Sequence, residues 1–324
     1  MLVRFLRSHQ PILLIVIPVL AAILWLPAFL HPIVPIIKHQ MPLFELLARP
    51  FIVYPRLTGL IAFIFLLLQA FLFNYILAKY ELLGKPTYLP ALLYVVFGSL
   101  APSLLQLHPA LLANVFILLS LNCVLGTYRK TNALSACFEA GFFIALASLF
   151  YFPAVLGIVF ILIAVLVLRP FSGRELTIVL LGFLLPYLYL FVYYFVADKL
   201  DYLLVDRMLF PFMSRDLKFD VEIAQPYYEL VFFTGIAALL SIGRGMETSS
   251  RSVQYRSNIT VLRWLFIIGC LTLVLSPGLN YSYFFMALIP LLVLITSYFL
   301  WARIVWLAEI IMWMLVLVIV FNRY

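Results

Sequence analysis

Charge is scarce in this sequence: only 10% of its 324 residues are Asp, Glu, Lys or Arg, while 66% are hydrophobic. A soluble domain cannot bury that much apolar surface, whereas a lipid bilayer solvates it directly. The thirty Phe and nineteen Tyr residues fit aromatic belts at the two membrane interfaces. The composition therefore excludes an ordinary soluble protein and indicates an integral membrane protein.

Motifs of familiar chemistry are lacking as well. The three cysteines, Cys123, Cys137 and Cys270, lie in apolar runs without CxxC or Cys/His spacing, so we expect neither a disulfide nor a metal site. The four histidines do not share a predicted helix face, which gives no support to a helix-borne metal centre. The sequence also holds no P-loop, no G-x-S-x-G and no Ser/His/Asp set. We predict no cofactor and no metal.

Apolar runs separated by short polar or proline-containing links predict about eleven membrane spans in one transmembrane domain, residues 1–324. The expected spans cover residues 12–30, 58–78, 88–105, 109–126, two segments of 132–169 separated at Pro153, 175–197, 227–243, 260–277, 283–300 and 304–321. The first run has no A-x-A cleavage pattern after it and should remain as a span. The predicted fold class is an all-α, polytopic transmembrane helix bundle with one long outer loop. Residues 41–48 should form a short helix at the interface.

The distribution of cations predicts the orientation of the bundle. With the N-terminus in the cytoplasm, thirteen of the 21 Lys and Arg residues fall in inner loops and the other eight in outer ones. This agrees with the positive-inside rule, and four of the eight outer cations belong to the one long loop, where charge counts less. The cations lie between apolar runs, so the net charge of +8 indicates membrane orientation, and we expect no nucleic-acid partner.

Residues 198–229, here called the polar loop, carry seven of the thirteen carboxylates and should face the periplasm. Residues Leu200, Leu203, Leu204 and Met208 recur at helical spacing and predict an amphipathic helix on the membrane surface. Residues 217–223 alternate apolar and polar side chains, which predicts a strand. Three interpretations stay open: a solvated loop, a protein-docking surface, or a lid over a cavity. In the lid, an arginine would hold a phosphate and an aspartate would act as base. The candidate catalytic residues are Asp198, Asp201, Asp206, Arg207 and Arg215.

Several polar side chains lie inside predicted spans. Glu139 and Glu309 are near the inner face, and we expect Glu139 to face a packed interior with Arg174 or Arg129 as its ion-pair partner. Small residues around Glu139, Ala136/Ala140 and Gly141/Ala145, should let another helix approach closely. The amides of the second and fourth spans should form interhelical hydrogen bonds or line a polar path: Gln69, Asn74, Asn114 and Asn122.

A family resemblance is carried by residues 139–153 (EAGFFIALASLFYFP), Arg169-Pro170-Phe171, Arg174-Glu175 and residues 181–187 (LGFLLPY). In these segments the sequence resembles an uncharacterised family of bacterial multi-pass inner-membrane proteins. The resemblance implies the inner membrane and no activity. A weaker likeness is to polyprenyl-phosphate-sugar glycosyltransferases of the C-type fold and to O-antigen polymerases and ligases. The glycosyltransferases usually keep an acidic residue in the first outer loop as base or metal ligand. Here residues 31–55 offer Glu45 and no acidic pair.

The sequence thus predicts an inner-membrane component of cell-envelope biogenesis with an outward-facing docking loop. The alternative is a glycosyltransferase-like enzyme or glycan polymerase or ligase that acts on polyprenyl-linked substrates. The expected partners are the lipid bilayer and either a polyprenyl-phosphate lipid or another envelope protein.

Overall fold

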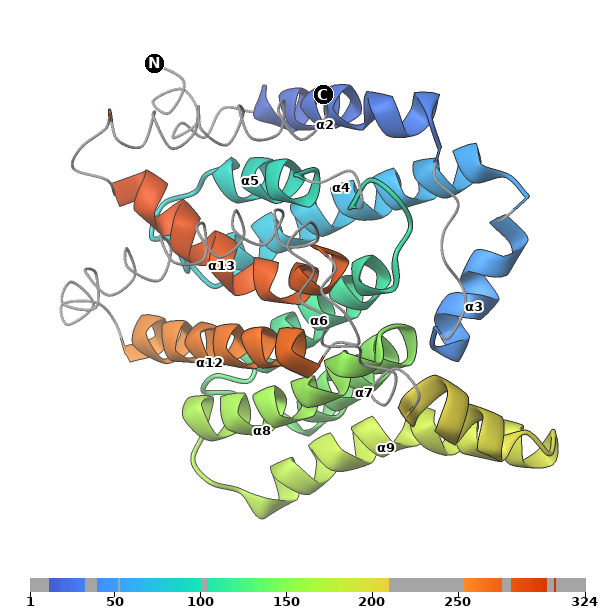
Figure 1. Ribbon diagram of the computed structural model, residues 1–324. Helices are drawn as coiled ribbons and strands as arrows, with labels where there is room; N and C mark the ends of the chain where they lie inside the picture. Colours follow the sequence, from blue (N-terminus) through green and yellow to red (C-terminus); the bar gives the residue numbers. More distant parts are fainter. Residues whose placement is uncertain are drawn as a thin grey trace.

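The computed structural model describes residues 12–32, 40–51, 53–100, 104–209, 253–275, 281–301 and 306. Within these ranges the regular elements are all helical, which confirms the all-α prediction (Figure 1). The elements are α2 (Leu13–Leu30), α3 (Pro42–Ala48), η1 (Arg49–Phe51), α4 (Pro55–Lys79), α5 (Leu89–Gly98), α6 (Pro109–Leu125), α7 (Leu134–Phe150), η3 (Phe152–Leu156), α8 (Gly157–Leu168), α9 (Gly173–Val196), the π-helix η4 (Tyr202–Leu209), α12 (Val253–Leu275) and α13 (Tyr281–Trp301).

Three helices in the described ranges are long and apolar enough to cross a membrane: α2, α4 and α9. They have 18, 25 and 24 residues, so their lengths run from about 27 to 38 Å at 1.5 Å per residue. A bilayer's hydrocarbon core is about 30 Å thick. Shorter apolar helices pack between them, and α6 and α7 have 17 residues each. The three long helices therefore have the length and composition that a membrane crossing requires.

Proline marks helix starts and one helix break. Pro42, Pro55, Pro90 and Pro109 lie in the first turns of α3, α4, α5 and α6, where a missing N–H costs no hydrogen bond. The predicted break at Pro153 is confirmed. Helix α7 ends at Phe150, Tyr151 is extended, and the turn η3 leads into α8.

Helix α5 is shorter than the expected span of residues 88–105. It covers ten residues, about 15 Å, or half the hydrocarbon thickness. All ten are buried, and Ser99 after the helix accepts a 3.0 Å hydrogen bond from the Trp25 indole N–H of α2. Non-helical backbone at membrane depth is tolerated where protein surrounds it. Among the described residues that follow α5, Ser99, Leu100, Leu104 and Leu105 are buried in this way.

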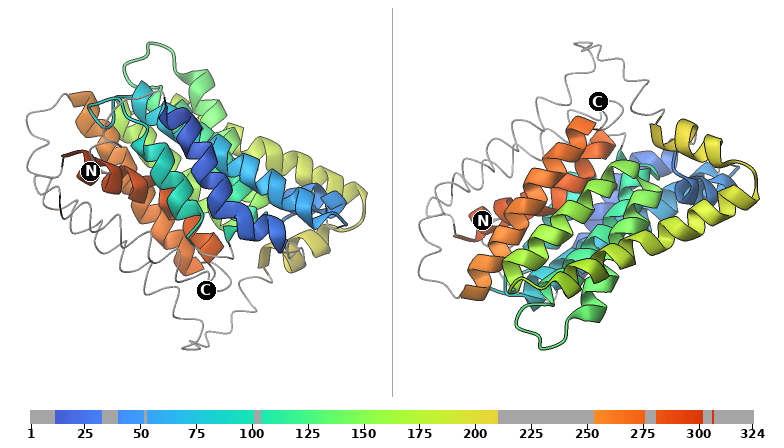
Figure 2. Two further views of the ribbon diagram at one scale, coloured as in Figure 1. Left: turned by 90° about the horizontal axis from the view of Figure 1, so that it is seen from above. Right: turned by 90° about the horizontal axis from the view of Figure 1, so that it is seen from below.

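The helices form one bundle, and their long axes run in similar directions (Figure 2). Helix α7 packs between α6 and α9, and α12 packs against α8 and α13. Helix α13 contacts α5 and α6. Helix α7 meets α9 at two glycines: a Cβ on Gly141 would lie 2.1 Å from the Val179 carbonyl oxygen, and one on Gly182 would lie 2.2 Å from that of Phe138. The predicted close approach of a helix to the small residues of α7 is confirmed at Gly141.

Candidate functional site

One candidate site lies where α3 meets the segment after α9. Helix α3 is the short helix predicted for residues 41–48. Phe44 and Ala48 are its buried residues. Glu45, on another face of α3, reaches toward η4, the start of the polar loop. Asp198, with a positive φ of 53°, makes the turn that follows α9 and sends the chain back toward α3.

The predicted amphipathic helix of the polar loop is present as η4, and its apolar stripe is buried. Leu203 and Met208 pack with Met41, Leu149 and Tyr187. The stripe therefore rests on the protein's own helices α7 and α9. Leu203 and Met208 thus face the protein, while the expected position of this helix at the membrane surface stays a prediction.

Arg207 is the central polar residue of η4, and its side chain is only 6% exposed. Its Nη2 lies 2.5 Å from Glu45 Oε2 and also donates to the Tyr202 hydroxyl, while Nη1 donates to the Gln40 carbonyl oxygen at 2.6 Å. Its guanidinium carbon lies 4.8 Å from the centroid of the Tyr202 ring. Both terminal nitrogens are thus engaged. Arg207 therefore joins η4 to α3 and to Gln40, and its predicted role in holding a phosphate stays a prediction.

Glu45 accepts two arginines. Its second oxygen, Oε1, lies 2.6 Å from Arg49 Nη2, one helical turn further along the chain. The Arg49 side chain is 71% exposed, in contrast to Arg207. The carboxylate therefore joins a buried cation to an exposed one.

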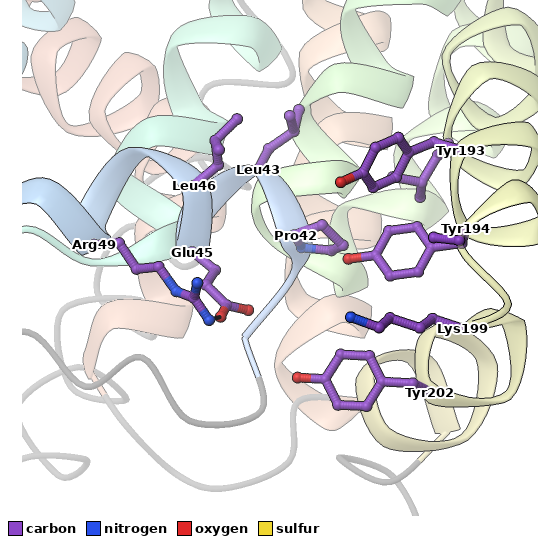
Figure 3. Close-up of a pocket in the computed structure, with 11 residues that line it drawn as sticks. Pro42, Leu43, Glu45, Leu46, Arg49, Tyr193, Tyr194, Lys199 and Tyr202 are labelled. Atoms are coloured by element: carbon purple, nitrogen blue, oxygen red, sulfur yellow. Dashed lines mark ion pairs between the residues drawn. The ribbon is translucent and has the colours of Figure 1, made fainter.

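Beside this ion-pair network is an open pocket of about 820 Å³. Figure 3 shows Tyr193, Tyr194, Lys199 and Tyr202 extending across it toward α3. The described residues that line it are Pro42, Leu43, Glu45, Leu46, Arg49, Leu190, Tyr193, Tyr194, Ala197, Lys199 and Tyr202. Two cations, three phenols and an apolar wall thus face one space.

The predicted catalytic residues are not brought together around this pocket. Asp198, Asp201 and Asp206 belong to the same segment but are not among the described lining residues. Asp198 and Asp201 are exposed. Arg215 and the predicted strand of residues 217–223 lie outside the described residues. Glu45 is the one carboxylate among the described residues of the lining.

The opposite end of the bundle carries another ion pair. Arg169 binds Glu175 through Nη2 and Oε1 at 2.7 Å, and its Nη1 donates to the carbonyl oxygens of Thr127 and Lys130 at 2.8 and 2.7 Å. Both side chains are close to nine-tenths buried. The pair ties the loop after α6 to the start of α9.

The expected ion pair of Glu139 is not formed. Arg174, which is exposed, is not among the ion pairs of the described residues, and neither is Arg129. Glu139 is exposed too, and its Oε2 accepts a weak hydrogen bond from Cys123 Sγ at 3.6 Å. The expectation of a packed interior is wrong because the buried face of α7 runs through Cys137, Ala140, Gly141 and Ile144. Glu139 points away from it, and Glu309 lies outside the described residues.

Gln69, Asn114 and Asn122 form interhelical hydrogen bonds, one of the two expected roles, whereas the buried Asn74 Oδ1 has no hydrogen-bond partner among the described residues. Gln69 Nε2 donates to the Leu111 carbonyl oxygen at 2.9 Å, the Tyr94 hydroxyl donates to Gln69 Oε1 at 2.7 Å, and Asn114 Nδ2 donates to Tyr94 at 3.3 Å. Asn122 Oδ1 accepts from Lys79 Nζ at 3.0 Å. These bonds join α4, α5 and α6.

Sequence reasoning missed the partners of Arg207 and Arg169. Arg169 and Glu175 are six positions apart across Pro170, a local signal that was available. Glu45 and Arg207 are 162 positions apart, and no local pattern connects them. The one available sign was that Glu45 is the only carboxylate of the first outer loop.

The described residues form an apolar, all-α bundle with three helices long and apolar enough to cross a membrane and with ion pairs at its two ends, which suggests a helical membrane protein. No curated protein and no solved structure matches the chain. Residues 29–324 match the family described as "Family of unknown function (DUF6427)", and the chain belongs to that family. The predicted membership of an uncharacterised family is thereby confirmed.

Proposed function

We propose that this protein is a multi-pass component of the bacterial inner membrane that serves cell-envelope biogenesis. Its N-terminus faces the cytoplasm, and the polar loop faces the periplasm. The chain crosses the membrane about eleven times. Residues 40–51 and 197–209 together form the outward binding surface.

The observation that carries this proposal is the ion pair between Arg207 and Glu45. The two residues come from the two loops whose charge pattern predicts the outer side. Residues predicted for the inner side meet one another at the other end of the bundle: Lys79 with Asn122, and Arg169 with the carbonyl groups of Thr127 and Lys130. Each crossing from α2 to α9 then alternates in direction. The half-length α5 is compatible with this scheme because Ser99 and Leu104, described residues beyond its C-terminal end, are also buried.

A second candidate is a glycosyltransferase-like enzyme for polyprenyl-linked substrates. It is favoured by the position of Glu45, an acidic residue of the first outer loop that lines a pocket. A general base must accept a proton from its substrate, however, and both oxygens of Glu45 are engaged by arginines. The contacts of Glu45 therefore fit a structural role better than a catalytic one.

Complementation separates these two functions. Deletion of the gene in the bacterium that encodes it should raise dye leakage through the envelope, and the intact gene should restore the barrier. Glu45→Gln retains an acceptor for Arg207, so a binding component should keep most of its function. If Glu45 is instead a catalytic base, Glu45→Gln should lower the restored barrier function roughly 100-fold or more although the protein still folds. Glu139→Gln, at an exposed site distant from the pocket, is the control. A deletion without effect on the envelope would overturn the proposal.

A further inference from the structure

The charge around the pocket favours an anion. Glu45 is the one carboxylate among the described lining residues, and the buried Arg207, which does not line the pocket, already neutralises its negative charge. Arg49, which also binds Glu45 Oε1, and Lys199 add two exposed cations from two different elements, so cations outnumber the carboxylate here. In the part of the chain that the structure describes, the Lys199 ammonium group makes no ion pair. Figure 3 shows it between the hydroxyl groups of Tyr194 and Tyr202, directed toward α3.

The wall of the pocket that comes from α9 includes the apolar residues Leu190 and Ala197 and continues into the exposed surface of that helix. Leu190 and Tyr193 line the pocket. Tyr193 is 69% exposed, and Tyr189, one helical turn before it on the same side of α9, is 68% exposed. Helix α9 is one of the three helices fit to cross a membrane, and it is mostly unburied. In the proposed membrane insertion, the pocket therefore lies at the end of a helix whose exposed side faces lipid.

We propose that this pocket binds the phosphate head group of a membrane lipid while the acyl chains of that lipid lie along α9. Arg49 and Lys199 contact the phosphate, since the guanidinium fork binds two oxygens and the ammonium group supplies a compact charge. Tyr194 and Tyr202 donate hydrogen bonds from rings suited to a membrane interface. Arg207 holds α3 in place and does not touch the ligand. The inference rests on the proposed membrane insertion and names the ligand of the proposed outward surface.

Binding of fluorescent phosphatidic acid to the purified full-length protein in uncharged detergent tests this assignment. Arg49→Gln and Lys199→Gln should each weaken binding roughly fivefold, the effect of one basic residue near an anionic lipid surface. Arg56→Gln is the matched control, because Arg56 is an exposed cation at the start of α4 that is not among the lining residues. It should leave binding unchanged. Thermal unfolding of each variant shows that it remains folded.

Two competitors identify the source of the phosphate. Inorganic phosphate should displace the lipid poorly, and diacylglycerol, which has the chains without the phosphate, should bind weakly. Inorganic phosphate that binds as tightly as the lipid would overturn the lipid assignment, and diacylglycerol that binds equally well would overturn the role of the cations. An equal loss in the Arg56 variant would reduce the effect to general attraction and defeat the proposal. Flotation of the protein with vesicles, measured separately, reports membrane insertion, so failure of the proposed function is distinguishable from failure of this site.

Discussion

Arg207 and Glu45, 162 positions apart in the chain, meet in an ion pair of 2.5 Å at one end of the bundle. The guanidinium is nearly enclosed, and the Gln40 carbonyl oxygen completes its hydrogen bonds. A buried cation of this kind needs its carboxylate, because removal of one partner leaves an uncompensated charge. The pair therefore determines how the first and fourth outer loops of the predicted topology join.

Loss of Glu45 should destabilise the protein more than loss of Arg49. Glu45→Leu leaves the buried Arg207 guanidinium without its carboxylate, so the free energy of unfolding should fall by about 3 kcal/mol. Arg49→Leu removes a mostly exposed partner and should cost less than about 1 kcal/mol. Thermal unfolding in detergent measures both. The double variant Glu45→Leu/Arg207→Leu should lose less than the two single losses added together, and strict additivity would show that the pair is energetically unimportant.

The crossing of α7 and α9 predicts a sharp contrast among glycines. Gly141→Ala and Gly182→Ala place a methyl group against backbone carbonyl oxygens, so each should lower the free energy of unfolding by about 3 kcal/mol, the upper end of the overpacking range. Gly173→Ala, where an added Cβ meets nothing within 4 Å, should be neutral or slightly stabilising. Similar melting temperatures for all three alanine variants would contradict this packing.

Arg169 should not be replaceable by lysine. Its fork binds Glu175 and two carbonyl oxygens of the preceding loop at once, which a single ammonium group cannot reproduce. We expect Arg169→Lys to cost about 2 kcal/mol in the free energy of unfolding, the value of one or two charged hydrogen bonds. The exposed neighbour Arg174 provides the comparison, and Arg174→Lys should leave the free energy of unfolding unchanged. If both lysine variants unfold alike, the clamp does not contribute to stability.

Glu139→Leu should change the free energy of unfolding by no more than about 0.5 kcal/mol, because the carboxylate is exposed and lies off the packed face of α7. Circular dichroism of the variant during heating gives this number. A loss of several kcal/mol would mean that the side chain has a buried partner after all.

His108 predicts a dependence of stability on pH. It caps α6, where its Nδ1 accepts the Leu111 N–H at 3.1 Å, and burial lowers its pKa from 6.5 to about 3. Between these two values the unfolded chain binds the proton and the folded chain does not. Lowering the pH from about 6.5 toward 3 should therefore reduce the free energy of unfolding, by at most about 1.4 kcal/mol per pH unit.

His108→Asn tests this contribution directly. Asparagine keeps an acceptor for the helix N-terminus but does not titrate. The difference in stability between the variant and the parent should shrink as the pH falls through this window. A constant difference from pH 7 to pH 4 would rule out the histidine as its origin.

Much of the helical architecture follows from local sequence. Apolar runs predict the helices, Pro153 predicts the break between α7 and α8, and Gly141 predicts a close helix contact, because each effect acts within a few residues. The extent of α5 was not predictable, since Leu100, Leu104 and Leu105 are as apolar as a span but lie outside the helix, which ends at Gly98.

The candidate site was predictable only in part. The sequence indicates that residues 41–48 and 200–208 are helical, and it gives the stripe of Leu203 and Met208. It does not indicate that Arg207 turns inward to Glu45, because that contact depends on how α3 and η4 are positioned by the rest of the bundle. The orientation of Glu139 has the same origin: the neighbours of α7 decide which face is buried, and those neighbours come from elsewhere in the chain.

The central claim is that the loops joined by Arg207 and Glu45 lie together on the outer side of the membrane. Labelling of single cysteines with a membrane-impermeant maleimide tests it most directly, in a background where Cys123, Cys137 and Cys270 are replaced by alanine. Leu46→Cys and Asp201→Cys, at two exposed positions beside the pocket, should be labelled in spheroplasts with an intact inner membrane. Lys130→Cys, at the opposite end of the bundle, should react only after the membrane is permeabilised. Labelling of Lys130→Cys from outside with Asp201→Cys protected would contradict the account.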